Sequence, residues 1–66
     1  METREIIILW REGAWRCEFH PGFGGESRLL VYRGEQVAAA ESTPTGEPAF
    51  RRADALRQRV LSGDIH

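Results

Sequence analysis

Residues 6–19 read IIILWREGAWRCEF, two apolar runs separated by a short polar stretch around Gly13. This pattern predicts a β-hairpin. Glycine accepts a positive φ without steric cost, so we place a two-residue loop at Glu12-Gly13. Directly opposed residues share a face of the sheet. One face then carries the predicted pairs Trp10–Trp15, Ile8–Cys17 and Ile6–Phe19, and the other carries Ile7 and Leu9 opposite Glu18 and Arg16.

A second hairpin turns around Gly34 in RLLVYRGEQVAAAE, residues 28–41. Its loop is either Arg33-Gly34 or Gly34-Glu35, and both choices give the same two faces. One face carries Leu30, Tyr32, Val37 and Ala39, and the other carries Leu29, Val31, Ala38 and Ala40. Neither face is polar enough to be identified as the solvent side.

From Pro48 to Leu61 the apolar residues follow the period of a helix. Thr45 suits its N-cap and Gly63 its C-terminal end. The inward stripe comprises Ala49, Phe50, Ala53, Leu56, Val60 and Leu61, and the outward face comprises Arg51, Arg52, Gln58 and Arg59. The predicted fold is therefore α+β, a four-stranded antiparallel β-meander with one C-terminal helix packed on one face (ββββα).

The composition indicates one small domain, residues 1–66. Cys17 is the only cysteine, which excludes an intramolecular disulfide and favours a cytoplasmic location. The apolar run 6–10 is too short for a membrane span, so we expect no membrane association. All nine basic residues are arginine, as expected for a GC-rich, bacterial coding sequence, and the net charge is −1.

The stretch HPGFGGE, residues 20–26, has the glycine content of a phosphate-binding loop. Such loops bind phosphate at a helix N-terminus, whereas SRLLVY, the next segment, has the pattern of a strand. We therefore predict a plain connecting loop, in which Phe23 either caps the core or is exposed.

Cys17, His20 and His66 are candidate metal ligands. Structural zinc takes four ligands, and the predicted register places Cys17 and His20 on opposite faces. The same geometry separates a Cys–His nucleophile pair. We expect no metal, no cofactor, no catalytic residues and no enzyme activity.

The arginines suggest one alternative function, because arginine interleaved with aromatic residues can form a nucleic-acid surface. AWRCEF (14–19) and AFRRADAL (49–56) resemble the Trp-containing strand and the helix start of the arm-type DNA-binding domain of phage integrases. The resemblance implies a sheet followed by a helix and weak binding of nucleic acid. The candidate contact residues are Arg16, Arg51, Arg52 and Arg59.

The run IIILW, residues 6–10, is apolar on both faces of its strand, which is typical of a strand buried on both sides. One helix covers only one face. Either the chain folds back over the second face, or another molecule covers it. We favour a non-enzymatic interaction module, a homodimer or the complex of a protein partner, joined through the uncovered face and the first strand. The predicted interface residues are Ile7, Leu9, Leu29 and Val31.

Overall fold

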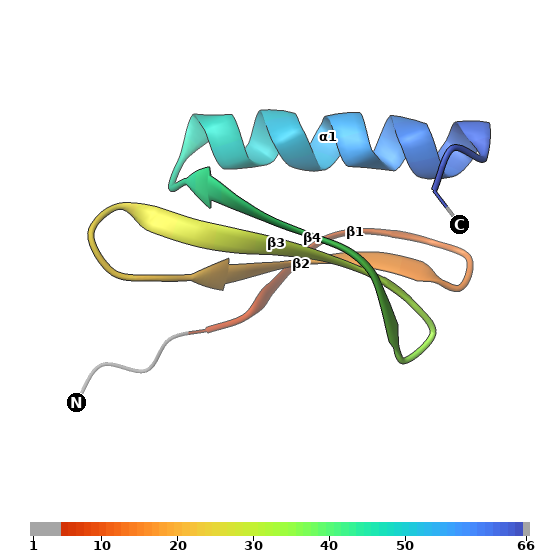
Figure 1. Cartoon of the computed structure of the whole chain (residues 1–66), viewed down its shortest axis with the longest axis horizontal. Helices are drawn as coiled ribbons and strands as arrows, with labels where there is room; N and C mark the ends of the chain where they lie inside the picture. Colours follow the sequence, from red (N-terminus) through yellow and green to blue (C-terminus); the bar gives the residue numbers. More distant parts are fainter. Residues whose placement is uncertain (1–4, 66) are drawn as a thin grey trace.

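The computed structural model describes residues 5–65 and confirms the predicted ββββα arrangement. The sheet is antiparallel, with the strands in the order β1-β2-β3-β4. Figure 1 shows the helix lying along one face of the sheet, while no helix covers the other. β1 and β4 are the two edges. The elements are β1 (Ile7–Glu12), β2 (Trp15–Pro21), β3 (Glu26–Arg33), β4 (Gln36–Pro44) and α1 (Glu47–Ser62).

The β1–β2 and β3–β4 hairpins each turn at a two-residue loop whose first residue is glycine. Glu12 pairs with Trp15, so the first loop is Gly13-Ala14 and the predicted loop was wrong by one residue. The second loop is Gly34-Glu35, because Arg33 pairs with Gln36. Gly13 and Gly34 have φ values of 58° and 62°, at the position where a type II′ turn needs a positive φ.

A β-bulge in β1 changes which isoleucines face the helix. Trp10 pairs with Cys17 and Ile8 pairs with Glu18, so Leu9 is an extra residue. The predicted pairs Trp10–Trp15, Ile8–Cys17 and Ile6–Phe19 are therefore wrong. Ile7 lies opposite Phe19 on the face toward α1, whereas Ile8 shares the open face with Glu18. The prediction reversed these two isoleucines because strict alternation does not allow for an inserted residue.

The other edge strand also contains a bulge. Val31 pairs with Ala39 and Tyr32 pairs with Val37, which leaves Ala38 as the extra residue of β4. Ala39 consequently shares the helix-facing side with Val31, and not one face with Tyr32 and Val37 as predicted. Each edge of the sheet is thus locally irregular, while the central β2–β3 ladder continues without a shift.

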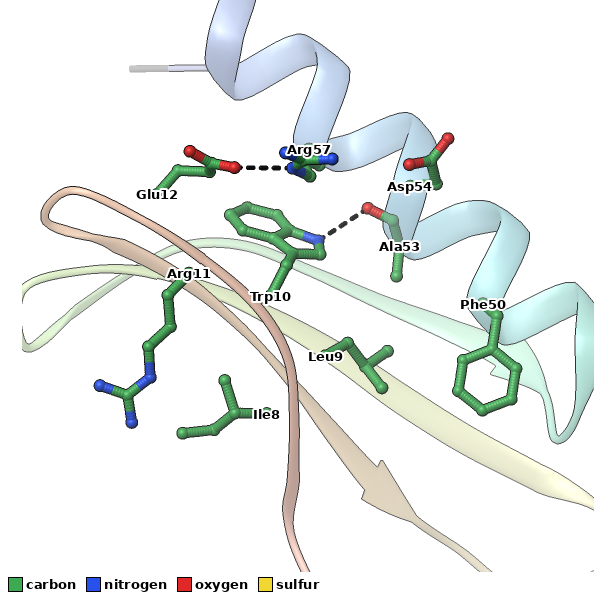
Figure 2. Close-up of a pocket in the computed structure, with 9 residues that line it drawn as sticks. All are labelled: Ile8, Leu9, Trp10, Arg11, Glu12, Phe50, Ala53, Asp54 and Arg57. Carbon is green, nitrogen blue, oxygen red and sulfur yellow. Dashed lines mark hydrogen bonds and ion pairs between the residues drawn. The ribbon is translucent and has the colours of Figure 1, made fainter.

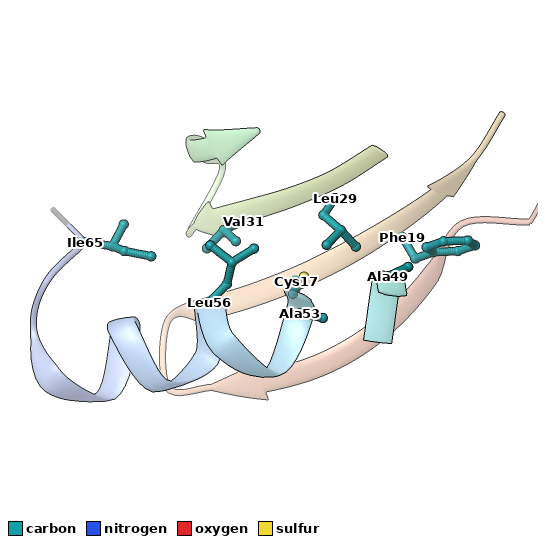
Figure 3. Close-up of a cluster of buried hydrophobic side chains, with 8 residues drawn as sticks. All are labelled: Cys17, Phe19, Leu29, Val31, Ala49, Ala53, Leu56 and Ile65. Atoms are coloured by element: carbon teal, nitrogen blue, oxygen red, sulfur yellow. The ribbon is translucent and has the colours of Figure 1, made fainter. Parts of the chain in front are cut away.

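The hydrophobic core lies between α1 and the covered face of the sheet (Figure 3). Two alanines of α1, Ala49 and Ala53, allow the helix backbone to approach the strands closely. Phe50 and Leu61 lie at the margin of the helical stripe and are 57% and 55% exposed, although the periodicity placed them in it. The buried cluster comprises Cys17, Phe19, Leu29, Val31, Ala49, Ala53, Leu56 and Ile65.

The two ends of α1 differ in how well the sequence predicted them. Gly46, and not Thr45, is the N-cap, and no side chain caps this end. The Thr45 hydroxyl instead donates to Ser27 Oγ at 3.3 Å. Gly63 ends the helix in the left-handed conformation, as predicted. The reversal that follows brings Ile65 back into the core (Figure 3).

The glycine-rich segment is the loop between β2 and β3, which confirms its prediction as a connection. The amide of Gly22 donates to the Glu26 carbonyl at 2.9 Å. A Cβ atom at Gly22 would lie 2.6 Å from that carbonyl oxygen, so the turn requires glycine. Phe23 is 80% exposed and does not cap the core. In the described range no helix has the length and apolar character needed to cross a membrane.

Candidate protein-binding site

A groove of 570 Å³ runs between the edge strand β1 and α1 (Figure 2). Leu9 and Trp10 from β1, and Phe50 and Ala53 from α1, form its apolar part. Ile8 and Arg11 border it from β1, with their side chains directed away from the helix in Figure 2. The groove exists because α1 does not close onto the edge of the sheet here.

Trp10 fixes the spacing of the two walls. Its indole N–H donates to the main-chain carbonyl of Ala53 at 2.8 Å, a bond that crosses from β1 to α1. The ring also packs against the buried core cluster. An indole suits this position, because its apolar ring packs on the core while its N–H finds a hydrogen-bond acceptor. Trp10 therefore lines the groove and joins β1 to α1 through its hydrogen bond.

One end of the groove is charged. Arg57 Nε donates to the Glu12 carboxylate at 2.7 Å, which links the end of β1 to α1. Both side chains are partly exposed, so this ion pair contributes little to stability, on the order of 0–1 kcal/mol. Asp54 lies beside this pair and is exposed. The groove therefore changes from apolar to charged along its length.

Exposed apolar side chains adjoin the groove at the start of β1. Ile6, Ile7 and Ile8 are 56%, 48% and 39% exposed. Ile7 lies opposite Phe19, whose ring stacks on that of Phe50 at 6.4 Å, so the apolar surface continues from β1 to α1. Contiguous apolar patches on small proteins mark interaction sites. We call this region the β1 corner; it comprises Ile7, Leu9 and Phe50 on the helix side of the sheet, Ile8 on the open face, and Ile6, which precedes the strand.

The predicted interface residues are not gathered on one uncovered surface. Leu29 and Val31 are fully buried beneath α1, so their predicted place on the open face is wrong. Leu9 packs against the core and lines the groove, on the helix side of the sheet. Ile7 is exposed at the β1 corner. The prediction did not include Phe50 among the interface residues. Its position directly after Ala49, at the edge of the apolar stripe of the helix, is the sequence signal that could have indicated its exposure.

The open face of the sheet is polar at its centre. Glu18 accepts hydrogen bonds from Arg16 Nε at 2.8 Å and pairs with His20 Nε2 at 2.9 Å. The hydrogen bond from Arg16, with a smaller contribution from His20, lowers the pKa of Glu18. The Arg16 guanidinium also lies over the Tyr32 ring, 4.2 Å from its centre. The centre of this face is thus polar, and Glu18 and Arg16 share it as the predicted pairing placed them together.

The four arginines considered for nucleic-acid binding do not form one surface. Arg16 lies on the open face, whereas Arg51, Arg52 and Arg59 lie on α1, on the other side of the sheet. Arg51 pairs with Glu47 one helical turn away. Arg52 donates to Glu41 of β4 at 2.8 Å, and this hydrogen bond raises the pKa of Arg52. Of these four arginines, Arg59 is exposed near the end of α1 and forms no ion pair within residues 5–65.

The Cys17 thiol is buried in the core, as predicted. Burial, with smaller contributions from Glu18 and Glu41, raises its pKa to about 11. His20 lies on the opposite face with Glu18, and His66 lies outside the described residues. Within residues 5–65 no three side chains of His, Cys, Asp or Glu are grouped so as to hold a metal ion.

Comparison with protein families, with curated proteins and with solved structures finds no match for this chain. The resemblance to arm-type DNA-binding domains therefore rests on its two short motifs alone. The function has to be argued from the geometry of the β1 corner and the groove beside it.

Proposed function

We propose that this chain is a non-enzymatic interaction module that binds an extended polypeptide segment along the outer edge of β1. The observation that carries the proposal is the coincidence of two features at one place. Among residues 5–65, an edge strand without a neighbour on its outer side lies directly beside a partly apolar groove against α1. Recognition of a peptide by strand addition uses both features together.

The backbone supplies the first part of the binding energy. The outer side of an edge strand presents N–H and C=O groups that another strand can pair with. The bulge at Leu9 interrupts this row, so regular pairing is confined to the stretch before it, around Ile7 and Ile8. A short ladder favours reversible binding of one segment.

Side chains supply the second part, and with it the specificity. Successive residues of an extended segment point to opposite faces, so every second side chain of the bound segment meets the groove. An apolar residue there contacts Leu9 and Phe50, while a basic residue further along meets Asp54. The volume of 570 Å³ falls within the usual range for ligand sites, about 300–1,000 Å³.

A peptide probe tests the proposal. The probe is a capped heptapeptide in which valine and threonine alternate, with a lysine at each end for solubility. Trp10 lines the groove, so its fluorescence reports binding when Trp15→Phe removes the second indole. We expect a saturable change with the probe. A peptide of the same sequence with alternate amides N-methylated cannot donate along one edge and is expected to leave the fluorescence unchanged.

Two exposed residues of α1 provide a matched pair of variants. Phe50→Ser removes the apolar wall of the groove and is expected to weaken binding of the probe. Leu61→Ser, at a residue of nearly equal exposure near the other end of α1, is expected to leave binding intact. Equal responses to both peptides, or no response to either at concentrations where the protein is monomeric, would contradict strand capture at β1.

A further inference from the structure

We infer that the open face of the sheet, opposite α1, binds single-stranded nucleic acid. The inference concerns a surface other than the groove and goes beyond the proposed function. Three observations carry it: basic side chains that the strand pairing gathers on this face, planar groups held among them, and a small hollow at one end. Of the four arginines that the sequence suggested for this role, only Arg16 belongs to the face.

Three arginines lie on the open face at positions fixed by the strand pairing. Arg11 lies directly opposite Arg16, and like charges in this position are destabilising. Arg28 lies opposite His20 in the β2–β3 pair. Arg11 and Arg28 are exposed, and neither forms an ion pair with another residue in the range 5–65. Phosphate groups beside these two arginines would supply the counter-charge.

The acidic side chains of the face do not cancel this charge. Glu18 lies at the centre, but its carboxylate already accepts a hydrogen bond from Arg16 and pairs with His20. Glu26 lies at the margin, where β3 begins. The described part of the face thus carries three guanidinium groups against two carboxylates, although the whole chain has a net charge of −1. A polyanion is therefore expected to approach the protein from this side.

Planar groups lie among the charges. The Arg16 guanidinium lies over the Tyr32 ring, 4.2 Å from its centre, and also donates to the Gly34 carbonyl. These contacts fix the guanidinium while 30% of the Arg16 side chain stays exposed. Unpaired bases stack on arginine planes and on aromatic rings. This feature favours a nucleic acid over an acidic peptide, which has no bases to stack.

A hollow of 210 Å³ lies at the loop end of the same face. Phe23, which is 80% exposed, lines it together with Arg28 and Ser42. Its volume is below the usual range for a whole ligand, about 300–1,000 Å³, and suits one flat ring. Glu26 also lines the hollow, so an amino group of a base fits there better than a phosphate. A base beside Phe23 and a phosphate beside Arg28 are neighbours in one strand.

Arg11 and Arg28 lie at opposite corners of this basic area. Their partners on β2, Arg16 and His20, are four residues apart, and β2 lies between the two arginines. With about 3.4 Å per residue and about 4.8 Å between strands, the Cα atoms of Arg11 and Arg28 are about 16 Å apart. An extended strand of a few nucleotides spans this distance and lies over Arg16 and His20.

Fluorescence anisotropy with a labelled single-stranded dodecamer of deoxycytidylate tests the inference at neutral pH and low salt. We expect saturable binding that weakens with salt at a slope of about −1.4, for two phosphate contacts at about −0.7 each. Arg11→Gln and Arg28→Gln are each expected to reduce the slope to about −0.7 and the affinity about fivefold. The matched control, Arg59→Gln, removes the same charge from α1 and is expected to change neither.

A conservative variant separates stacking from charge. Arg16→Lys keeps the positive charge but removes the planar group over Tyr32. We expect it to weaken binding about threefold and to leave the salt slope unchanged. Circular dichroism checks that each variant is folded.

Two further probes separate bases from phosphates. Duplex DNA of the same length and inorganic polyphosphate are both polyanions, but neither offers unpaired bases. We expect each to bind about tenfold more weakly than the single strand. Equal affinity for either probe, no binding of the single strand at low salt, or equal losses with Arg11→Gln and Arg59→Gln would overturn the inference.

Discussion

The two edges of the sheet have the same type of irregularity but present different surfaces. β4 and β1 each contain one bulge. β4 has alanines at positions 38–40, ends at Pro44, and is tied to α1 by the ion pair of Arg52 with Glu41. β1 has exposed isoleucines and stands apart from α1, joined to it across a groove by Trp10 and Arg57.

This difference shows that two edges with the same irregularity can present unequal surfaces. Natural proteins blunt edge strands with proline, charge, bulges or a covering element. Both edges of this sheet contain a bulge and are joined to α1 by a hydrogen bond of 2.8 Å, so these features do not distinguish them. β4 differs in its alanines and its terminal proline, whereas β1 carries larger apolar side chains beside the groove.

The largest expected effect on stability comes from removing the Trp10 side chain, which joins β1 to α1. Trp10→Ala removes packing against the core and the hydrogen bond to Ala53, and is expected to lower the free energy of unfolding by about 3 kcal/mol. Urea denaturation measures the change. Val37→Ala at the exposed start of β4 serves as the control, with an expected loss below about 0.5 kcal/mol. Equal losses for the two variants would show that Trp10 does not stabilise the β1 edge more than Val37 stabilises the β4 edge.

Alkaline pH acts on the core shared by both edges. The pKa of the Cys17 thiol is about 11 in the folded chain, against an ordinary value of 9.0. The unfolded chain therefore loses the thiol proton first, and stability that is fully present below pH 9.0 is lost as the pH rises toward about 11. The expected loss is about 2 kcal/mol at pH 10.5. Urea denaturation of wild type and of Cys17→Ala measures it, and parallel pH profiles would contradict it.

The ion pair between Arg52 and Glu41 contributes less to the free energy of unfolding, because both side chains are partly exposed. Arg52→Ala is expected to lower the free energy of unfolding by about 0.5 kcal/mol. A double-mutant cycle with Glu41→Gln isolates the contribution of the pair. A coupling near zero would mean that the ion pair does not stabilise the packing of α1 against β4.

The smallest expected effect concerns the open face between the two edges. Arg16, and to a lesser extent His20, hold the pKa of Glu18 below its ordinary value. The carboxylate therefore contributes stability that is present above the unfolded pKa and is lost as the pH falls through the lower folded value. Glu18→Gln should remove part of the acid sensitivity below pH 4.5, as thermal unfolding across that range would show. An unchanged acid profile would mean that the interactions of Glu18 with Arg16 and His20 do not contribute measurably to stability.

The sequence predicted the order and type of all five elements, because turn glycines and the change of period from strand to helix are local signals. It did not predict the extra residues Leu9 and Ala38, since alternation counts every residue and a bulge adds one. The second hairpin is apolar on both faces, so the side facing α1 depends on its pairing with β2. For this reason Leu29 and Val31 were assigned to the wrong surface.

The groove could not be read from the sequence, because it depends on where α1 crosses the sheet. Its components were visible: IIILW as an apolar run, and Phe50 beside Ala49 and Ala53. What was missing was their juxtaposition, which the bulge and the bond from Trp10 to Ala53 together establish.

The single inserted residue at Leu9 also has a consequence for tolerance to deletion. A chain without it would keep Ile7 opposite Phe19 and Ile8 opposite Glu18, because the one-residue shift at the bulge would disappear together with the extra residue. It would gain a straight, uninterrupted margin rich in isoleucine, the kind of template on which identical chains stack without limit into amyloid-like fibrils. Deletion of this one residue is therefore expected to turn an interrupted edge into a continuous one that promotes aggregation.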